Sequence, residues 1–198
     1  MRWYPLVLIT LALLLIPPTL SYDLSDYPSP LFIDAHGKFN GVIIIGDFAA
    51  SEDVIGAISI LGSLQRAALE KSITADGRVL NPTPIPNTAI RLASEIDDIA
   101  KYNAIIVGGS CANPYASRLM GYPADCLEGF KTGIGYVRLY EHENGKRSLL
   151  VAGRSAMDTR RAANVVASYD RYVLNGTEQQ VTNYNIDEIT IKGDGAAP

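Results

Sequence analysis

A serine and a cysteine follow one of the apolar runs in an arrangement that could support nucleophilic catalysis. Segment 108–112 reads Gly-Gly-Ser-Cys-Ala and approaches the Gly-x-Ser-x-Gly turn of serine hydrolases, with Ala112 in place of the last glycine. Ser110 or Cys111 would need a base, and His142 is the candidate. A cysteine nucleophile would also have to remain a free thiol. The competing interpretation is a capping serine and a disulfide cysteine.

A second group of polar residues could bind an anion. Asp158, Arg160 and Arg161 lie at the start of a predicted helix, where backbone N–H groups attract negative charge. This arrangement suits a small-solute-binding module. The alternative is that Asp158 caps the helix while the two arginines face solvent or pair with nearby carboxylates.

Glycines close three apolar runs, at Gly46, Gly108 and Gly153. Such turns bind phosphate in nucleotide-binding folds. The binding candidates are therefore the neighbouring Asp47, Gly109 and Arg154, together with Asp158 at the helix start described above. The Gly-x-Gly-x-x-Gly spacing and the P-loop lysine are absent, and an aspartate at position 47 would repel phosphate. We therefore expect no nucleotide cofactor, and interpret the glycines as close strand-to-helix turns.

Composition argues against metal and nucleic-acid binding. The chain has two histidines and two cysteines, with none of the spacings of a zinc site. Its net charge is −4, and no cluster of lysines and arginines suits nucleic acid. We expect no metal site, no cofactor and no nucleic-acid partner.

The apolar runs that precede these glycines define the expected fold. Segments 42–45, 104–107 and 149–152 have no polar alternate face, which is typical of parallel strands covered by helices on both sides. Helical patterning follows at 51–70, with Ser51 as the expected N-cap, and at 89–100, 114–120 and 158–172.

The last part of the sequence indicates antiparallel strands. Segment 136–140 alternates, and Asn144-Gly145 predicts a type I′ hairpin turn before the third apolar run. An edge strand is expected at 184–191. The prediction is an α/β fold: a three-layer sandwich with a mainly parallel sheet, helices on both faces and a C-terminal β-hairpin and edge strand. The carboxyl ends of the three core strands should share one edge of the sheet.

The N-terminus predicts export. Residues 1–21 combine Arg2, an apolar stretch and small residues around Ser21, as signal peptides do. The alternative is an uncleaved anchor, but the apolar stretch is shorter than the about 20 residues of a membrane span. We expect a single α/β domain over 22–191, a flexible tail over 192–198 and no membrane span after signal removal.

Two modifications fit an exported chain. Cys111 and Cys126 are the only cysteines, and export favours a disulfide between them. Asn175-Gly176-Thr177 is a glycosylation acceptor.

Three blocks of this sequence carry a resemblance. Tyr-Pro-Ser-Pro-Leu-Phe at 27–32, followed by segment 41–57, resembles the opening of archaeal S-layer proteins and their small S-layer-like relatives. Segment 105–113 is similar to that family's strand-Gly-Gly-x-Cys-Ala-Asn motif, with Ser110 where proline is more usual. Segment 150–163 resembles its closing strand and helix.

The resemblance implies a non-enzymatic cell-surface domain in a protein coat, with cell-envelope or S-layer proteins as partners and self-association as a further expectation. Full S-layer subunits are several times longer and add β-rich domains. A minor coat component, a partner that docks on the lattice and a free exported domain all stay open. The alternative from the residues is an extracytoplasmic hydrolase using Ser110 or Cys111 with His142, or a small-solute-binding module.

Overall fold

A computed structural model describes residues 22–73, 83–182 and 190–193. The predicted signal peptide at 1–21 lies outside these residues, as do most of the predicted last strand and residues 194–198 of the predicted tail. Within the described ranges, no helix has both the length and the apolar character needed to cross a membrane.

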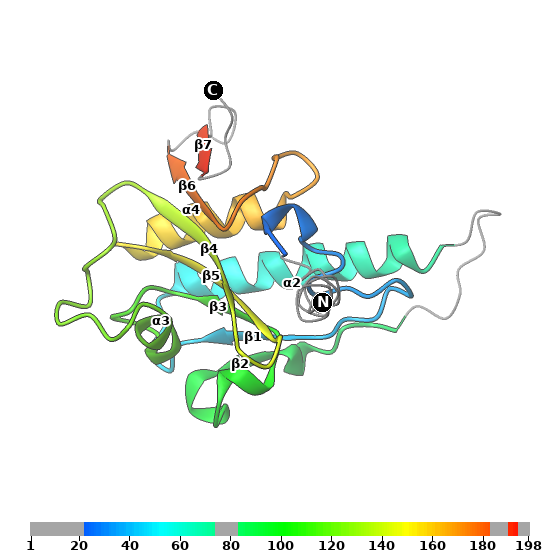
Figure 1. The fold of residues 1–198 in the computed structure, drawn as a ribbon, viewed down its shortest axis with the longest axis horizontal. Coiled ribbons are helices and arrows are strands. Elements are labelled where there is room, and N and C mark those ends of the chain that lie inside the picture. The colour runs from blue at the N-terminus through cyan, green and yellow to red at the C-terminus, as the bar shows by residue number, and fades with distance from the viewer. Residues whose placement is uncertain (1–21, 74–82, 183–189, 194–198) are drawn as a thin grey trace, which may run out of the picture.

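The strands form one mixed sheet in the order β2-β1-β3-β5-β4-β6-β7 (Figure 1). The strands are β1 (Val42–Ile45), β2 (Ile90–Leu92), β3 (Ala104–Val107), β4 (Gly135–Glu141), β5 (Arg147–Gly153), β6 (Glu178–Thr182) and β7 (Thr190–Gly193). The first four in this order are parallel, whereas β4 is antiparallel to both of its neighbours and β7 to β6. β7 includes the first two residues of the predicted tail.

Helices cover both faces of this sheet, so alternate residues of its central strands enter two separate cores. Ile43 and Ile105 face the pair formed by α2 (Ser51–Lys71) and α4 (Ala156–Ala167). Ile44 and Ile106 face the other side, under α3 (Pro114–Leu119).

Short 3-10 turns complete the layer that contains α3: η3 (Ala93–Glu95) and η4 (Ile99–Lys101). Two further turns are η1 (Leu24–Asp26) and η2 (Asn87–Ala89). The predicted α/β sandwich is confirmed.

The two long helices approach closely where α2 carries a glycine. A Cβ on Gly56 would lie 2.8 Å from Cβ of Ala163 on α4, so the packing of the pair depends on the missing side chain. A Cβ on Gly62, six residues later, would meet open space. The same helix therefore contains one glycine required by packing and one that is not.

Substituting these two glycines should change stability in opposite directions. We expect Gly56→Ala to lower the free energy of unfolding by about 1 to 2 kcal/mol because it overpacks the contact with α4. Gly62→Ala should raise it by about 0.5 to 1 kcal/mol, since alanine is the better helix former. Urea denaturation of both variants measures the two values. Equal changes in the free energy of unfolding of the two variants would contradict the close contact between Gly56 and Ala163.

The predicted helix at 89–100 is wrong. The segment contains β2, which pairs with β1 at Ile43↔Ile90, followed by η3 and η4. Ala93, Ile96 and Ile99 are buried at a spacing of three residues, which successive 3-10 turns satisfy as well as an α-helix does.

Other boundaries also differ from expectation. The N-cap of α2 is Ala50, and Ser51 is the first helical residue. In the β4–β5 hairpin only Gly145 has a positive φ, of 77°, so the turn is not type I′, which needs two such residues. β6, whose segment alternates buried and partly buried residues, has no counterpart in the sequence prediction.

Candidate functional site

The carboxyl ends of β1, β3 and β5 lie at one edge of the sheet, as predicted. The register pairs Ile45 with Val107 and Val107 with Val151, which brings the three following turns together. In open α/β sheets this carboxyl edge is where ligands bind. It is therefore the candidate site.

The glycines at this edge are required by close backbone contacts. A Cβ on Gly46 would lie 1.8 Å from the carbonyl oxygen of Ala112, and one on Gly109 would lie 2.8 Å from the carbonyl oxygen of Gly153. A Cβ on Gly153 would meet Cβ of Asp158 at 2.3 Å. The turns after the three strands thus contact one another and the start of α4, which supports the structural interpretation of these glycines.

Asn113 fixes the turn after β3, and the sequence analysis gave it no role. It is fully buried, and its Nδ2 donates to the carbonyl oxygens of Ile44 and Val107 at 3.1 and 3.2 Å. Its Oδ1 accepts from the N–H of Tyr115, which makes it the N-cap of α3. An asparagine directly before a proline at a helix start is the signal that could have identified this role.

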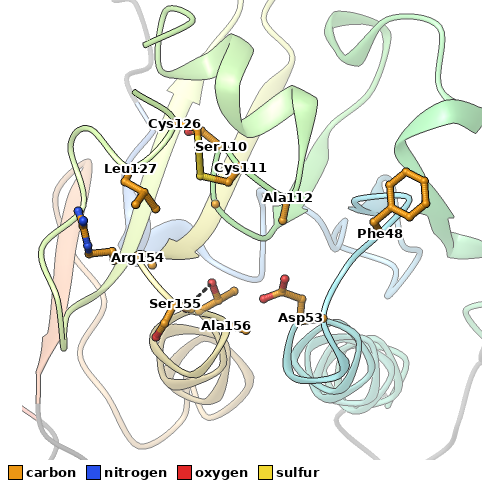
Figure 2. Close-up of a pocket in the computed structure, with 14 residues that line it drawn as sticks. Phe48, Asp53, Ser110, Cys111, Ala112, Cys126, Leu127, Arg154, Ser155 and Ala156 are labelled. Atoms are coloured by element: carbon orange, nitrogen blue, oxygen red, sulfur yellow. Dashed lines mark hydrogen bonds between the residues drawn. A yellow bond between two sulfur atoms is a disulfide. The ribbon is translucent and has the colours of Figure 1, made fainter. Parts of the chain in front are cut away.

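The predicted disulfide between Cys111 and Cys126 is confirmed. It closes the segment that leads from the β3 turn, through α3, towards β4. Figure 2 shows the bond above the starts of α2 and α4, beside Ser110. The bridge therefore holds the loop that covers the carboxyl edge.

A cavity of about 150 Å³ remains at this edge (Figure 2). Its lining comes from the first turns of α2 and α4, from the turns after β1, β3 and β5, and from the loop at 126–127. The apolar part of this lining, here called the apolar wall, includes Ala112, Leu127, Ala156 and the disulfide. Pockets for drug-sized molecules usually occupy about 300 to 1,000 Å³, so this cavity suits only a small group.

Asp53 is the buried charged group of the cavity. Its side chain projects from the first turn of α2 into the space below Ala112 (Figure 2), and the residue is 2% exposed. Its Oδ1 has no hydrogen-bond partner among the described residues. Burial raises the pKa of Asp53 from 3.8 to about 6, although the Thr159 hydroxyl and the Ala50 N–H oppose the shift. The sequence analysis treated Asp53 only as first-turn charge.

This raised pKa predicts a stability that falls with rising pH. The folded protein holds the Asp53 proton more tightly than the unfolded chain, whose pKa is 3.8, so ionisation costs more in the folded state. Between about pH 4.5 and pH 7.5 the contribution of Asp53 to the free energy of unfolding should fall by about 2 kcal/mol. Denaturation of the protein and of Asp53→Asn across this range measures the difference.

Asp47→Asn is the matched control, because Asp47 is an exposed carboxylate at the same edge. This variant should keep the pH dependence of the unmodified protein. An Asp53→Asn variant that keeps it too would contradict the assignment to Asp53.

The structure separates the residues of the hydrolase hypothesis. Cys111 is in the disulfide, and the Ser110 hydroxyl donates to Sδ of Met120 at 3.1 Å. His142 lies at the hairpin end of β5, where Nε2 is 2.7 Å from Oγ of Ser148.

The distance between the two ends of β5 rules out direct contact. Ser148 and Gly153 are five residues apart on β5, or about 16 Å at the usual strand rise. Ser110 is next to Gly109, which contacts Gly153, so the histidine is at the far end of the strand from Ser110. Burial, with a smaller contribution from Arg118, also lowers the pKa of His142.

The residues predicted to bind an anion at the start of α4 mostly form bonds within the protein instead. Ser155 is the N-cap, and Asp158 completes a capping box by accepting from the Ser155 N–H at 3.3 Å. Asp158 is 3% exposed and also accepts from Arg161 at 3.2 Å and from the Gly133 N–H at 3.3 Å. Arg160 is partly buried and lies outside the cavity lining. These residues fix the helix start, with Ser155 rather than Asp158 as the cap.

The other two binding candidates with side chains also contact the protein itself. Asp47 accepts hydrogen bonds from the backbone N–H and the hydroxyl of Ser94, which joins the β1 turn to η3. Arg154 donates to the carbonyl oxygen of Phe130 at 3.5 Å and extends away from Asp53 (Figure 2). Both residues are exposed; Arg154 is among the residues that line the cavity, whereas Asp47 is not.

Asn175, the predicted glycosylation site, is partly buried. Its Oδ1 accepts from Nε2 of Gln179 at 2.9 Å. This bond holds the carbonyl side of the amide, while a glycan would be attached through Nδ2.

No protein-family model matches the sequence, and no curated protein matches it.

Proposed function

We propose that this chain is an exported, S-layer-like cell-surface protein with a structural or interaction role rather than a catalytic one. The proposal places it after signal cleavage in the cell envelope, where its partners are other envelope or S-layer proteins or further copies of itself. It combines the resemblance of three sequence blocks to archaeal S-layer proteins with the way the carboxyl edge is built.

One observation carries the non-catalytic part of the proposal: apart from Asp53, the polar residues predicted to bind or react at the carboxyl edge are engaged in contacts within the protein. Asp47, Arg154 and Asp158 each bond to a neighbouring segment, and Cys111 is in the disulfide. An edge that joins turns, loop and helix starts in this way serves to hold the domain together.

The disulfide supports the proposed location. Disulfides persist in oxidising environments and are rare in cytosolic proteins of most organisms. A signal peptide at 1–21 would bring the chain to such an environment.

Cell fractionation tests the location of the protein. Electron microscopy of the purified protein, alone or mixed with envelope proteins, tests whether it assembles. An antibody against the protein should detect it in washed cell envelopes of the source organism, and purified protein should associate with detergent-extracted envelope proteins or with itself. Recovery in the cytoplasmic fraction would contradict the proposed location. A monomer that binds no envelope component would contradict the interaction role.

Catalytic assays should give no turnover that depends on the hydrolase residues. We expect the protein, Ser110→Ala and His142→Ala to give the same background rate with ester and peptide substrates, since the histidine is on the order of 16 Å from the serine. A rate above background that disappears in either variant would support the hydrolase instead. Circular dichroism confirms that the variants are folded.

A further inference from the structure

The cavity at the carboxyl edge contains a carboxyl oxygen that lacks a donor. Asp53 is 2% exposed, and its Oδ1 is unpaired among the described residues. A buried polar atom without a partner is costly, typically by about 1 to 3 kcal/mol. Because the side chain projects into an open cavity, a bound group could supply the missing donor (Figure 2).

Neighbouring donors in the cavity are engaged elsewhere. The Thr159 hydroxyl is shared between the Asp53 carboxyl group and the carbonyl oxygen of Ser155, which is 3.3 Å away, and Oδ1 of Asp53 still has no partner among the described residues. The Ser110 hydroxyl donates to Met120. Arg154 donates to Phe130 on the far side of the loop. A bound molecule could therefore supply the donor for the free Asp53 oxygen.

Charge favours a cation over an anion at this position. Asp53 is the acidic residue of the lining, and Glu52 lies beside it in the first turn of α2. Asp158, in the first turn of α4, is paired with Arg161 and lies outside the lining. The guanidinium of Arg154 points away from Asp53 (Figure 2). The Asp158 N–H, which could otherwise bind an anion at the α4 terminus, already donates to Oγ of Ser155. A carboxylate or phosphate would face the Asp53 carboxyl group, whereas an ammonium would be attracted to it.

The size and the lining of the cavity indicate which chemical group carries the positive charge. Its volume of about 150 Å³ is of the size that holds a benzene-like molecule. The apolar wall offers contacts for methylene groups. A short alkyl chain with one terminal ammonium matches both the size and the lining.

We propose that this cavity binds a primary alkylammonium group, whose N–H donates to the free oxygen of Asp53 while its alkyl chain packs against the apolar wall. The group has two possible sources, a free small amine and the lysine side chain of a partner protein. Only the second source depends on the proposed interaction role.

Calorimetric titration near pH 7.5 tests the site with two probes. n-Butylammonium represents the free amine, and Nα-acetyl-lysine methylamide represents a lysine within a chain. We expect saturable binding of n-butylammonium and none of neutral n-butanol. Binding of the lysine probe as well would identify a protein side chain as an acceptable occupant. Failure of the lysine probe alone would identify a free amine and leave the proposed cell-surface role unaffected.

Two variants separate the site from general attraction to an acidic protein. Asp53→Asn should weaken n-butylammonium binding at least about tenfold, the loss expected for one charge-assisted hydrogen bond. Asp47→Asn removes an exposed carboxylate at the same edge and should leave binding unchanged. Absence of saturable binding by either amine, or equal binding by Asp53→Asn, would overturn the proposal. Ala156→Leu keeps the carboxyl group and should block binding by filling the cavity, which guards against misfolding of Asp53→Asn.

Discussion

Gly46→Ala should lower the free energy of unfolding by about 3 kcal/mol, the upper end of the usual cost of overpacking. The new Cβ would lie 1.8 Å from the carbonyl oxygen of Ala112. Real Cβ atoms do not approach a backbone oxygen so closely, so the turn after β3 has to move. The φ of Gly46 is not in the left-handed region, so space alone decides the effect.

The turn after β3 cannot move without breaking other bonds. The N–H groups of Ala112 and Asn113 both donate to the carbonyl oxygen of Gly109 at 2.9 Å. The Asn113 side chain ties the same turn to the ends of β1 and β3, through Ile44 and Val107. A shift that relieves the contact at Gly46 therefore disturbs buried hydrogen bonds.

Thermal and urea denaturation of Gly46→Ala measure this cost. Gly62→Ala is the control, because the same substitution there meets open space and should be mildly stabilising. A Gly46→Ala protein as stable as the unmodified one would show that the β3 turn does not press against the end of β1.

Removing the disulfide should have an effect of similar size. The bridge joins residues 15 positions apart, and a loop of that length corresponds to about 3 kcal/mol of restricted freedom in the unfolded chain. We expect Cys111→Ser with Cys126→Ser to lower the free energy of unfolding by about this amount. The loop over the carboxyl edge should become more mobile, because the bridge directly joins the β3 turn to the segment before β4.

Denaturation with and without reductant provides the matched comparison. Reductant should destabilise the unmodified protein to the level of the double variant and leave the double variant unchanged. Amide hydrogen exchange should show faster exchange in segment 111–126 of the variant. A double variant that unfolds at the same urea concentration as the oxidised protein would contradict a structural role for the bridge.

The core of the fold could be predicted because its signals are local. Each of the runs 42–45, 104–107 and 149–152 is apolar throughout, and such runs favour parallel strands buried on both faces. Gly46 and Gly153 mark the turns that follow. The predicted export signal and an even cysteine count were enough to predict the disulfide.

Segment 89–100 and β6 could not be predicted because their structure depends on distant neighbours. Ile90 becomes a strand residue by pairing with Ile43, whereas the spacing of Ala93, Ile96 and Ile99 alone fits a helix. β6 is short, polar and paired with β4, so little in its own sequence identifies it.

The candidate site was only partly accessible to sequence analysis for the same reason. The carboxyl edge followed from the strand order, but the role of each side chain there depends on packing between elements. Asp53 has the position of an ordinary first-turn carboxylate, but it is buried and contacts Thr159 of α4 and the β3 turn. From the sequence, Asp158 and Arg161 fit an anion-binding site at a helix start. In the structure, both form hydrogen bonds with the backbone of Gly133.

Intact-mass spectrometry of the protein from washed cell envelopes, without reductant, tests the account most directly, since it reports location, processing and oxidation together. The account predicts a chain that begins at Tyr22 and is two hydrogens lighter than its reduced form. A chain recovered only from cytoplasm, with Met1 or residues 2–21 still attached and both thiols free, would contradict it.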